Sequence, residues 1–270
     1  MTRSNLQLRV ATAAVGLPVV GVLVYLGGWP FAIGAAAVAL LASAEFFHGW
    51  LLPSLSIPRA ALSQPWFAVA GIVVASAHVD AQLPMAGVGV GLVAAAAGYS
   101  RTNRFGPRKP LRVLAWCLLY LAVPFSTIVL IRDVDQGRAW VLLGLLATFA
   151  VDTGAYAVGR LIGRHKMAPR ISPGKTWEGA AGGYVAGAAA VFGLNALLDT
   201  GVGSLTILHF AAAMPVAAMA GDLAESWMKR RMGVKDASGL LPGHGGFLDR
   251  LDSVLFVMPL LYLFLRVRVL

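Results

Sequence analysis

The stretch MPVAAMAGDLAESWMKRR, residues 214–231, indicates the fold class of the chain. It closes an apolar run that begins near residue 204, and a helix needs about 20 apolar residues to cross the hydrocarbon core of a bilayer. The run ends in basic side chains, which are typical of helix ends that meet lipid headgroups. We therefore predict a membrane-spanning helix at 204–228.

The composition of the whole chain also favours a membrane protein. Of its 270 residues, 58% are hydrophobic and 13% are charged, and the mean hydropathy is +0.75. Soluble domains carry about 25% charged residues, so the 12 acidic and 22 basic residues are too few to cover a soluble fold of this size. We expect lipid to be the solvent of most of the surface.

Nine stretches are apolar enough to be membrane-spanning helices. They run near 9–28, 30–52, 65–80, 82–99, 112–131, 139–161, 179–198, 204–228 and 251–266. The third and fourth are weak, and Asp80 leaves room only for a tight turn between them, so eight spans is the alternative. Glycine and alanine are abundant, as in GAAGGYVAGAAA at 179–190, and small residues let helices pack closely in lipid. We predict an all-α, polytopic transmembrane bundle of about nine spans.

The basic residues divide unequally between the two sides of this layout. Eighteen Lys and Arg fall on the side of the N-terminus and the even-numbered loops, and four fall on the other side. Cytoplasmic loops carry the excess of Lys and Arg, so we expect a multi-pass protein of the cytoplasmic (cell inner) membrane with its loops at 162–178 and 229–250 in the cytoplasm. Arg266 and Arg268 fit this poorly. We assign the net charge of +10 to contacts with membrane lipids, not to nucleic acid.

Acidic residues gather around those two loops. Seven of the twelve lie in or beside them: Asp152, Glu178, Asp222, Glu225, Asp236, Asp249 and Asp252. A carboxylate within a span costs about 2.5–3.5 kcal/mol on insertion scales, which makes Asp152 and Asp222 candidate functional residues. Asp222, Ser226 and Lys229 share one helical face, and such a stripe suits a metal–phosphate site. In the alternative, Lys229 and Arg230 simply reach the headgroups from a helix end.

The segment KDASGLLPGHGGFLDRLDS, residues 235–253, combines carboxylates with a glycine-rich loop. Glycines let backbone amides approach a ligand closely, and carboxylates bind hard cations such as Mg²⁺, which keep phosphate oxygens in their shell. Nearby Lys and Arg neutralise phosphate charge. The segment predicts metal-assisted phosphate chemistry. For His244 two interpretations stay open, a part in this chemistry or a hydrogen bond within its own glycine-rich loop. A Cys/His set for zinc is lacking.

The turn SPGKTWEG, residues 172–179, is a second basic and glycine-containing element. It lacks the earlier glycine of a P-loop. Lys175 can bind the phosphate of a lipid headgroup or of a nucleotide. Thr176 can instead cap the next helix, and both alternatives stay open at this point.

From Ser226 to Asp252 the chain resembles the phosphatidate cytidylyltransferases, also called CDP-diacylglycerol synthases. Their signature runs from a Ser through Lys-Arg, Lys-Asp and His-Gly-Gly to Asp-Arg and a final Asp, and this sequence matches every constrained position. Similar upstream positions are Asp152, Ala155-Tyr156, Gly159, Gly163, SPGKTWEG and Gly182-Gly183. Together they cover about the last 120 residues. Gly174 is a departure, because many members carry lysine there.

The resemblance implies a reaction of CTP with phosphatidic acid that gives CDP-diacylglycerol and pyrophosphate in phospholipid biosynthesis, with Mg²⁺ and room for a second cation. It implies catalytic roles for Lys229, Arg230, Lys235, Asp236, His244 and Arg250. It implies substrate-binding roles for Asp152, Ser172, Lys175, Thr176, Glu178, Ser226, Gly245 and Gly246. It assigns the metal to Asp222 and Asp249, with Asp236 and Asp252 as alternatives from the same signature.

Two other functions remain open on the sequence. One is a cytidylyltransferase of another lipid phosphate, since acyl chains are bound by apolar grooves that the residues do not identify. The other is a membrane transporter, which would carry ionisable residues deep in several spans, whereas Glu45 is the one acidic residue deep in the first five. We expect N-terminal helices at 1–135, about five spans, and a catalytic region at 136–270, and we leave homo-oligomer formation open.

Overall fold

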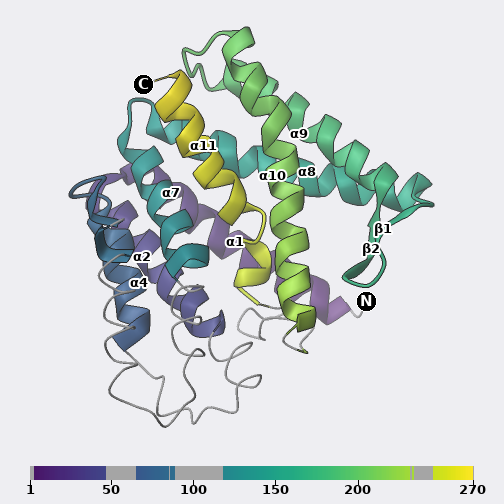
Figure 1. Cartoon of the computed structure of the whole chain (residues 1–270), viewed down its shortest axis with the longest axis horizontal. Helices are drawn as coiled ribbons and strands as arrows, with labels where there is room; N and C mark the ends of the chain where they lie inside the picture. Colours follow the sequence, from purple (N-terminus) through teal and green to yellow (C-terminus); the bar gives the residue numbers. More distant parts are fainter. Residues whose placement is uncertain are drawn as a thin grey trace. The chain divides into compact units, whose positions relative to one another are not determined.

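The computed structural model describes residues 3–46, 65–84, 86–88, 118–231, 233 and 246–269 (Figure 1). Its helices are α1 (Arg3–Leu26), α2 (Gly28–Glu45), α4 (Pro65–Ser76), α7 (Val123–Asp133), α8 (Gly137–Ile162), α9 (Trp177–Leu197), α10 (Ser204–Arg231) and α11 (Val254–Arg268). A π-helix, η4 (Leu118–Ala122), precedes α7, and a 3-10 helix, η5 (Leu248–Arg250), precedes α11. Two short strands, β1 (Lys166–Ala168) and β2 (Ser172–Thr176), form an antiparallel hairpin. The all-α prediction is confirmed.

Four described helices are long and apolar enough to cross a membrane: α2, α8, α9 and α10. Helices also lie in the predicted first, third, fifth and last stretches, but α4, α7 and α11 have fewer than 18 residues. Most of the predicted stretch at 82–99 lies outside the described residues. The structure is therefore that of a helical membrane protein, and the total of nine or eight spans stays a prediction.

The chain forms two compact units. The first contains residues 1–133 and 231–250, and the second contains 134–230 and 251–270. The described residues 246–250, which we assigned to the catalytic region, thus belong to the same unit as the N-terminal helices. The functional division predicted at residues 135 and 136 stays a prediction.

A corner in the first unit joins α1 to α2. Gly27 and Gly28 have φ angles of 65° and 52°, in the left-handed region that favours glycine. The Arg132 guanidinium, from α7, donates hydrogen bonds of 2.7 Å to the Val24 carbonyl and 3.3 Å to the Tyr25 carbonyl. These carbonyls belong to the last turn of α1, whose acceptors have no partners within the helix, so Arg132 fixes the corner.

In the second unit, α8 and α9 pack side by side through glycines (Figure 1). Gly179, Gly183 and Gly187 recur at every fourth position on α9 and face α8. A Cβ at Gly183 would lie 2.8 Å from the Val151 carbonyl oxygen, and one at Gly179 would lie 2.8 Å from that of Ala155. Only residues without a side chain let two helices approach this closely. The close packing predicted for 179–190 is confirmed.

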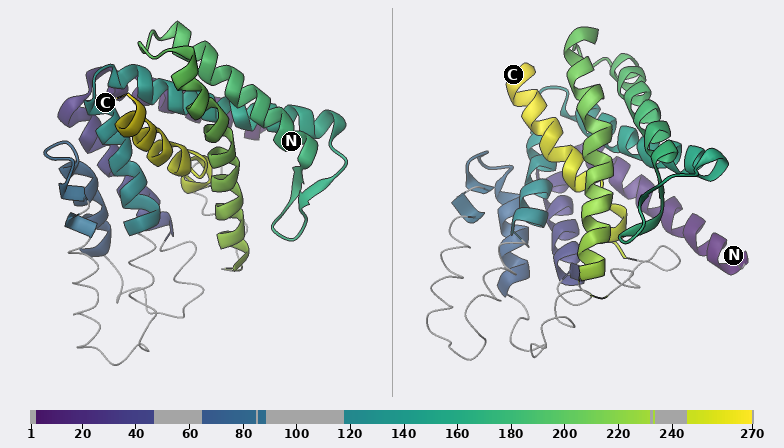
Figure 2. Two further views of the ribbon diagram at one scale, coloured as in Figure 1. Left: turned by 45° about the horizontal axis from the view of Figure 1, so that its top comes forward. Right: turned by 45° about the vertical axis from the view of Figure 1, so that its right-hand side comes forward.

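The predicted loop at 162–178 is mostly a β-hairpin. Its strands pair antiparallel, with Lys166 opposite Thr176 and Ala168 opposite Ser172, and it extends from the ends of α8 and α9 (Figure 2). Pairing satisfies backbone groups that a loop would leave to water. At its turn, the Ile171 carbonyl accepts a 3.1 Å hydrogen bond from Arg230 Nε on α10. The hairpin is thereby fixed to the charged end of α10.

Candidate active site

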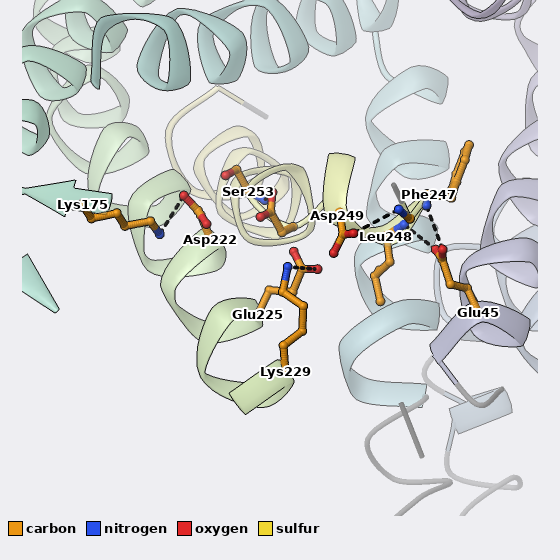
Figure 3. A network of polar contacts seen from close by, with 11 residues as sticks. Glu45, Lys175, Asp222, Glu225, Lys229, Phe247, Leu248, Asp249 and Ser253 are labelled. Carbon is orange, nitrogen blue, oxygen red and sulfur yellow. Dashed lines mark hydrogen bonds and ion pairs between the residues drawn. The ribbon is translucent and has the colours of Figure 1, made fainter. Parts of the chain in front are cut away.

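An ion pair joins the two polar segments predicted from the sequence. Lys175 Nζ, on β2, lies 2.7 Å from Asp222 Oδ2, on α10, and the two side chains are 20% and 36% exposed (Figure 3). The hairpin turn and the signature helix are 47 positions apart in the chain at these residues. The pair thus places an ammonium group, which can bind a phosphate, next to a carboxylate, which can bind a cation.

A second ion pair lies one turn further along α10. Lys229 Nζ is 3.3 Å from Glu225 Oε1, and the side chain of Glu225 is fully buried. Lys229 is only 16% exposed. Its amine therefore contacts the acidic stripe, and a contact of Lys229 with the headgroups stays an open alternative. Arg230 is exposed and bonded to the hairpin instead.

Asp252 joins the acidic cluster from the turn that precedes α11. Its Oδ1 accepts a 2.6 Å hydrogen bond from the Ser253 amide, and its carboxylate lies close enough to Asp222 and Glu225 to interact with them electrostatically.

In the first unit, η5 carries Asp249 and Arg250. Asp249 Oδ2 accepts a 3.0 Å hydrogen bond from the Gly246 amide, which closes a short turn. The two carboxylate oxygens of Glu45, at the end of α2, accept bonds of 2.9 Å and 2.6 Å from the amides of Phe247 and Leu248 (Figure 3). Sequence reasoning assigned no role to Glu45, although a carboxylate in an apolar span was the signal that could have identified it.

The turn SPGKTWEG is organised by its own side chains. Thr176 Oγ1 accepts a 3.1 Å hydrogen bond from the Gly179 amide, so Thr176 caps α9. Glu178 lies 2.6 Å from His165 Nδ1 and accepts a bond from the His165 amide. The capping interpretation of Thr176 is confirmed, and substrate contacts of Thr176, Glu178 and Ser172 stay predictions.

Two other predicted residues lie on described helices, and four lie outside the described residues. Asp152 is exposed on α8, and Ser226 is half-buried on α10. Lys235, Asp236, His244 and Gly245 lie outside the described residues. Asp222 and Asp249 belong to different units, so a cation shared by both stays a prediction. Within the described ranges, no three His, Cys, Asp or Glu side chains form a metal-binding group.

Comparison with known proteins identifies the family of this arrangement. A sequence model described as the cytidylyltransferase family matches residues 7–268. The chain belongs to the cytidylyltransferase family. The match includes the N-terminal helices, where the sequence showed no family motif and only a pattern of apolar stretches.

Similar members of the cytidylyltransferase family are named phosphatidate cytidylyltransferase. The protein of Staphylococcus epidermidis is 33% identical over 96% of this chain and 99% of its own length. That of Brucella suis is 35% identical over 97% of this chain and 93% of its own length. That of Bacillus subtilis is 42% identical over 54% of this chain and 55% of its own length.

Proposed function

We propose that the chain is a phosphatidate cytidylyltransferase, which converts CTP and phosphatidic acid into CDP-diacylglycerol and pyrophosphate. The observation that carries the proposal is the 2.7 Å ion pair of Lys175 and Asp222. It unites the basic turn and the acidic helix that the sequence analysis assigned to phosphate and metal. The names of the full-length relatives agree with this substrate pair.

The reaction needs charge neutralisation more than it needs a nucleophile from the protein. A phosphate oxygen of phosphatidic acid forms a bond to the α-phosphorus of CTP, and the bond from that phosphorus to the pyrophosphate oxygen breaks. Phosphoryl-transfer catalysis consists mainly of positioning and of electrostatic stabilisation. Lys175, Lys229, Arg230 and Arg250 provide cationic groups for this purpose, and we propose that Lys175 exchanges Asp222 for a phosphate oxygen.

We propose Mg²⁺ as the cofactor, bound by Asp222 and Asp249. Mg²⁺ prefers oxygen ligands, and besides Lys175 the neighbours of Asp222 in the described part of unit two include the carboxylates of Glu225 and Asp252. When bound, the ion neutralises charge on the phosphates of CTP. A second cation and a homo-oligomer are compatible with the proposal. The hairpin and the end of α10 face the cytoplasm, where CTP is available.

A reconstituted assay tests the function. Purified protein in lipid vesicles, supplied with CTP, Mg²⁺ and phosphatidic acid, is expected to release pyrophosphate and to form CDP-diacylglycerol in equal amounts. Removal of Mg²⁺ with a chelator should stop both. The same reaction with an ether-lipid phosphate or an isoprenoid phosphate in place of phosphatidic acid shows which lipid phosphate the protein uses. Absence of pyrophosphate with every lipid would refute the proposal and favour a non-enzymatic membrane protein.

A further inference from the structure

Glu45 makes a contact that the proposed chemistry does not yet use. It is the last residue of α2, it is 2% exposed, and its carboxylate binds two consecutive amides more than 200 positions away in the chain, those of Phe247 and Leu248. Glu45, these two amides and Asp249 all belong to the first unit.

The two amides are ones that would otherwise lack acceptors. The first N–H groups of any helix have no partner within it, and Leu248 opens η5. A carboxylate satisfies such donors by charge-assisted hydrogen bonds, which are shorter and stronger than neutral ones. In an apolar surrounding the bonds gain further strength. Conversely, the charge of Glu45 in an apolar helix is costly without such donors.

The contact determines how the turn with Asp249 begins. Since the Phe247 and Leu248 amides point to Glu45, the backbone is fixed immediately before Asp249. The adjacent Gly246 amide donates to Asp249 itself, at 3.0 Å. Three consecutive amides thus orient two carboxylates, one from α2 and one from η5.

We propose that Glu45 is a positioning residue for the reaction, which holds the turn that presents Asp249 and Arg250. The proposal rests on the proposed function, because Asp249 matters as a ligand only if that function is correct. In this role Glu45 does not bind the substrate or the cation directly. Its carboxylate acts through the backbone of residues 246–250.

The decisive variant is Glu45→Gln. Glutamine has nearly the same volume, but its NH₂ group would face a backbone amide, and two donors cannot bond to each other. Loss of one charge-assisted bond corresponds to a change of about tenfold to a hundredfold. We expect the Mg²⁺ concentration for half-maximal rate to rise by about that factor, with a smaller change in the KM for phosphatidic acid.

Ser43→Ala is the matched control. Ser43 lies two residues earlier on α2, is equally buried, and donates only to the Ala39 carbonyl of its own helix among the bonds described, at 2.7 Å. This variant removes a buried polar group without touching the turn at 246–250. It should lower stability slightly and leave the Mg²⁺ dependence at the wild-type value.

Hydrogen exchange supplies a readout that needs no activity. Without substrate, the amides of Phe247 and Leu248 should exchange more slowly in the wild type than in Glu45→Gln, and Ser43→Ala should match the wild type. Unchanged exchange in Glu45→Gln overturns the proposal. Faster exchange with unchanged Mg²⁺ dependence also overturns it, since the contact would then be structural only.

Two further outcomes are distinguishable. An inactive wild type would refute the proposed function, and with it the positioning role, while the exchange data would still establish the contact. If Glu45→Gln does not fold, Glu45→Asp replaces it, because it keeps the charge and is one carbon shorter. An intermediate Mg²⁺ requirement in Glu45→Asp supports the proposal, and a wild-type requirement overturns it.

Discussion

At the scale of single residues, the Lys175–Asp222 pair shows what sequence patterns leave undetermined. Each residue was a candidate because of its own surroundings: a lysine in a glycine-containing turn and a carboxylate in an apolar helix. Their contact at 2.7 Å depends on the pairing of the hairpin and on the Arg230 bond to it. The contacts of Glu45 are even harder to predict from the sequence, because they are made to backbone amides, which every residue except proline carries.

The Lys175→Ala variant tests the role of the pair in substrate binding. We expect the KM for CTP or for phosphatidic acid to rise about tenfold to a hundredfold, because a charge-assisted bond to phosphate is lost. Lys166→Ala is the control, since Lys166 is an exposed lysine on the other strand of the same hairpin. Steady-state kinetics with both substrates make the measurement. Equal losses in the two variants would indicate that the hairpin attracts anions by its overall charge instead.

At the scale of elements, the helices were predictable and the hairpin was not. Apolar length is a local property, so α8, α9 and α10 lie close to the stretches expected at 139–161, 179–198 and 204–228. A hairpin needs a specific register between two strands, and residues 166–176 lack the alternation of apolar and polar residues that would show it. The glycines gave a correct prediction of close packing, but not which of them face α8.

Gly183→Ala tests the α8–α9 contact. Its new Cβ would lie 2.8 Å from the Val151 carbonyl oxygen, and backbone cannot move aside as a flexible side chain can. Overpacking of this kind costs about 1–3 kcal/mol, so the melting temperature should fall. Gly193→Ala on the same helix is the control, since nothing lies within 4 Å of its new Cβ and alanine favours a helix. A drop of the same size in both would contradict the packing described.

At the scale of the whole molecule, the sidedness of the chain follows from its charges. The 18-to-4 distribution of Lys and Arg predicts that the hairpin lies in the cytoplasm and the α9–α10 connection on the opposite side. In a background without the native Cys117, Arg170→Cys and Ser204→Cys place single thiols at exposed positions of these two segments. A membrane-impermeant thiol reagent applied from outside should label only the second. Labelling of both from one side would contradict the predicted topology.

The corner between α1 and α2 has a consequence for how related sequences can vary. A Cβ at Gly27 would lie 2.3 Å from Nη2 of Arg132, in space that the guanidinium fills. A larger residue at position 27 would displace Arg132 and leave the carbonyls of Val24 and Tyr25 without this donor. Positions 27 and 132 should therefore change together in related sequences or not at all. A sequence without the arginine can replace the glycine, provided that the backbone at position 27 no longer has a positive φ.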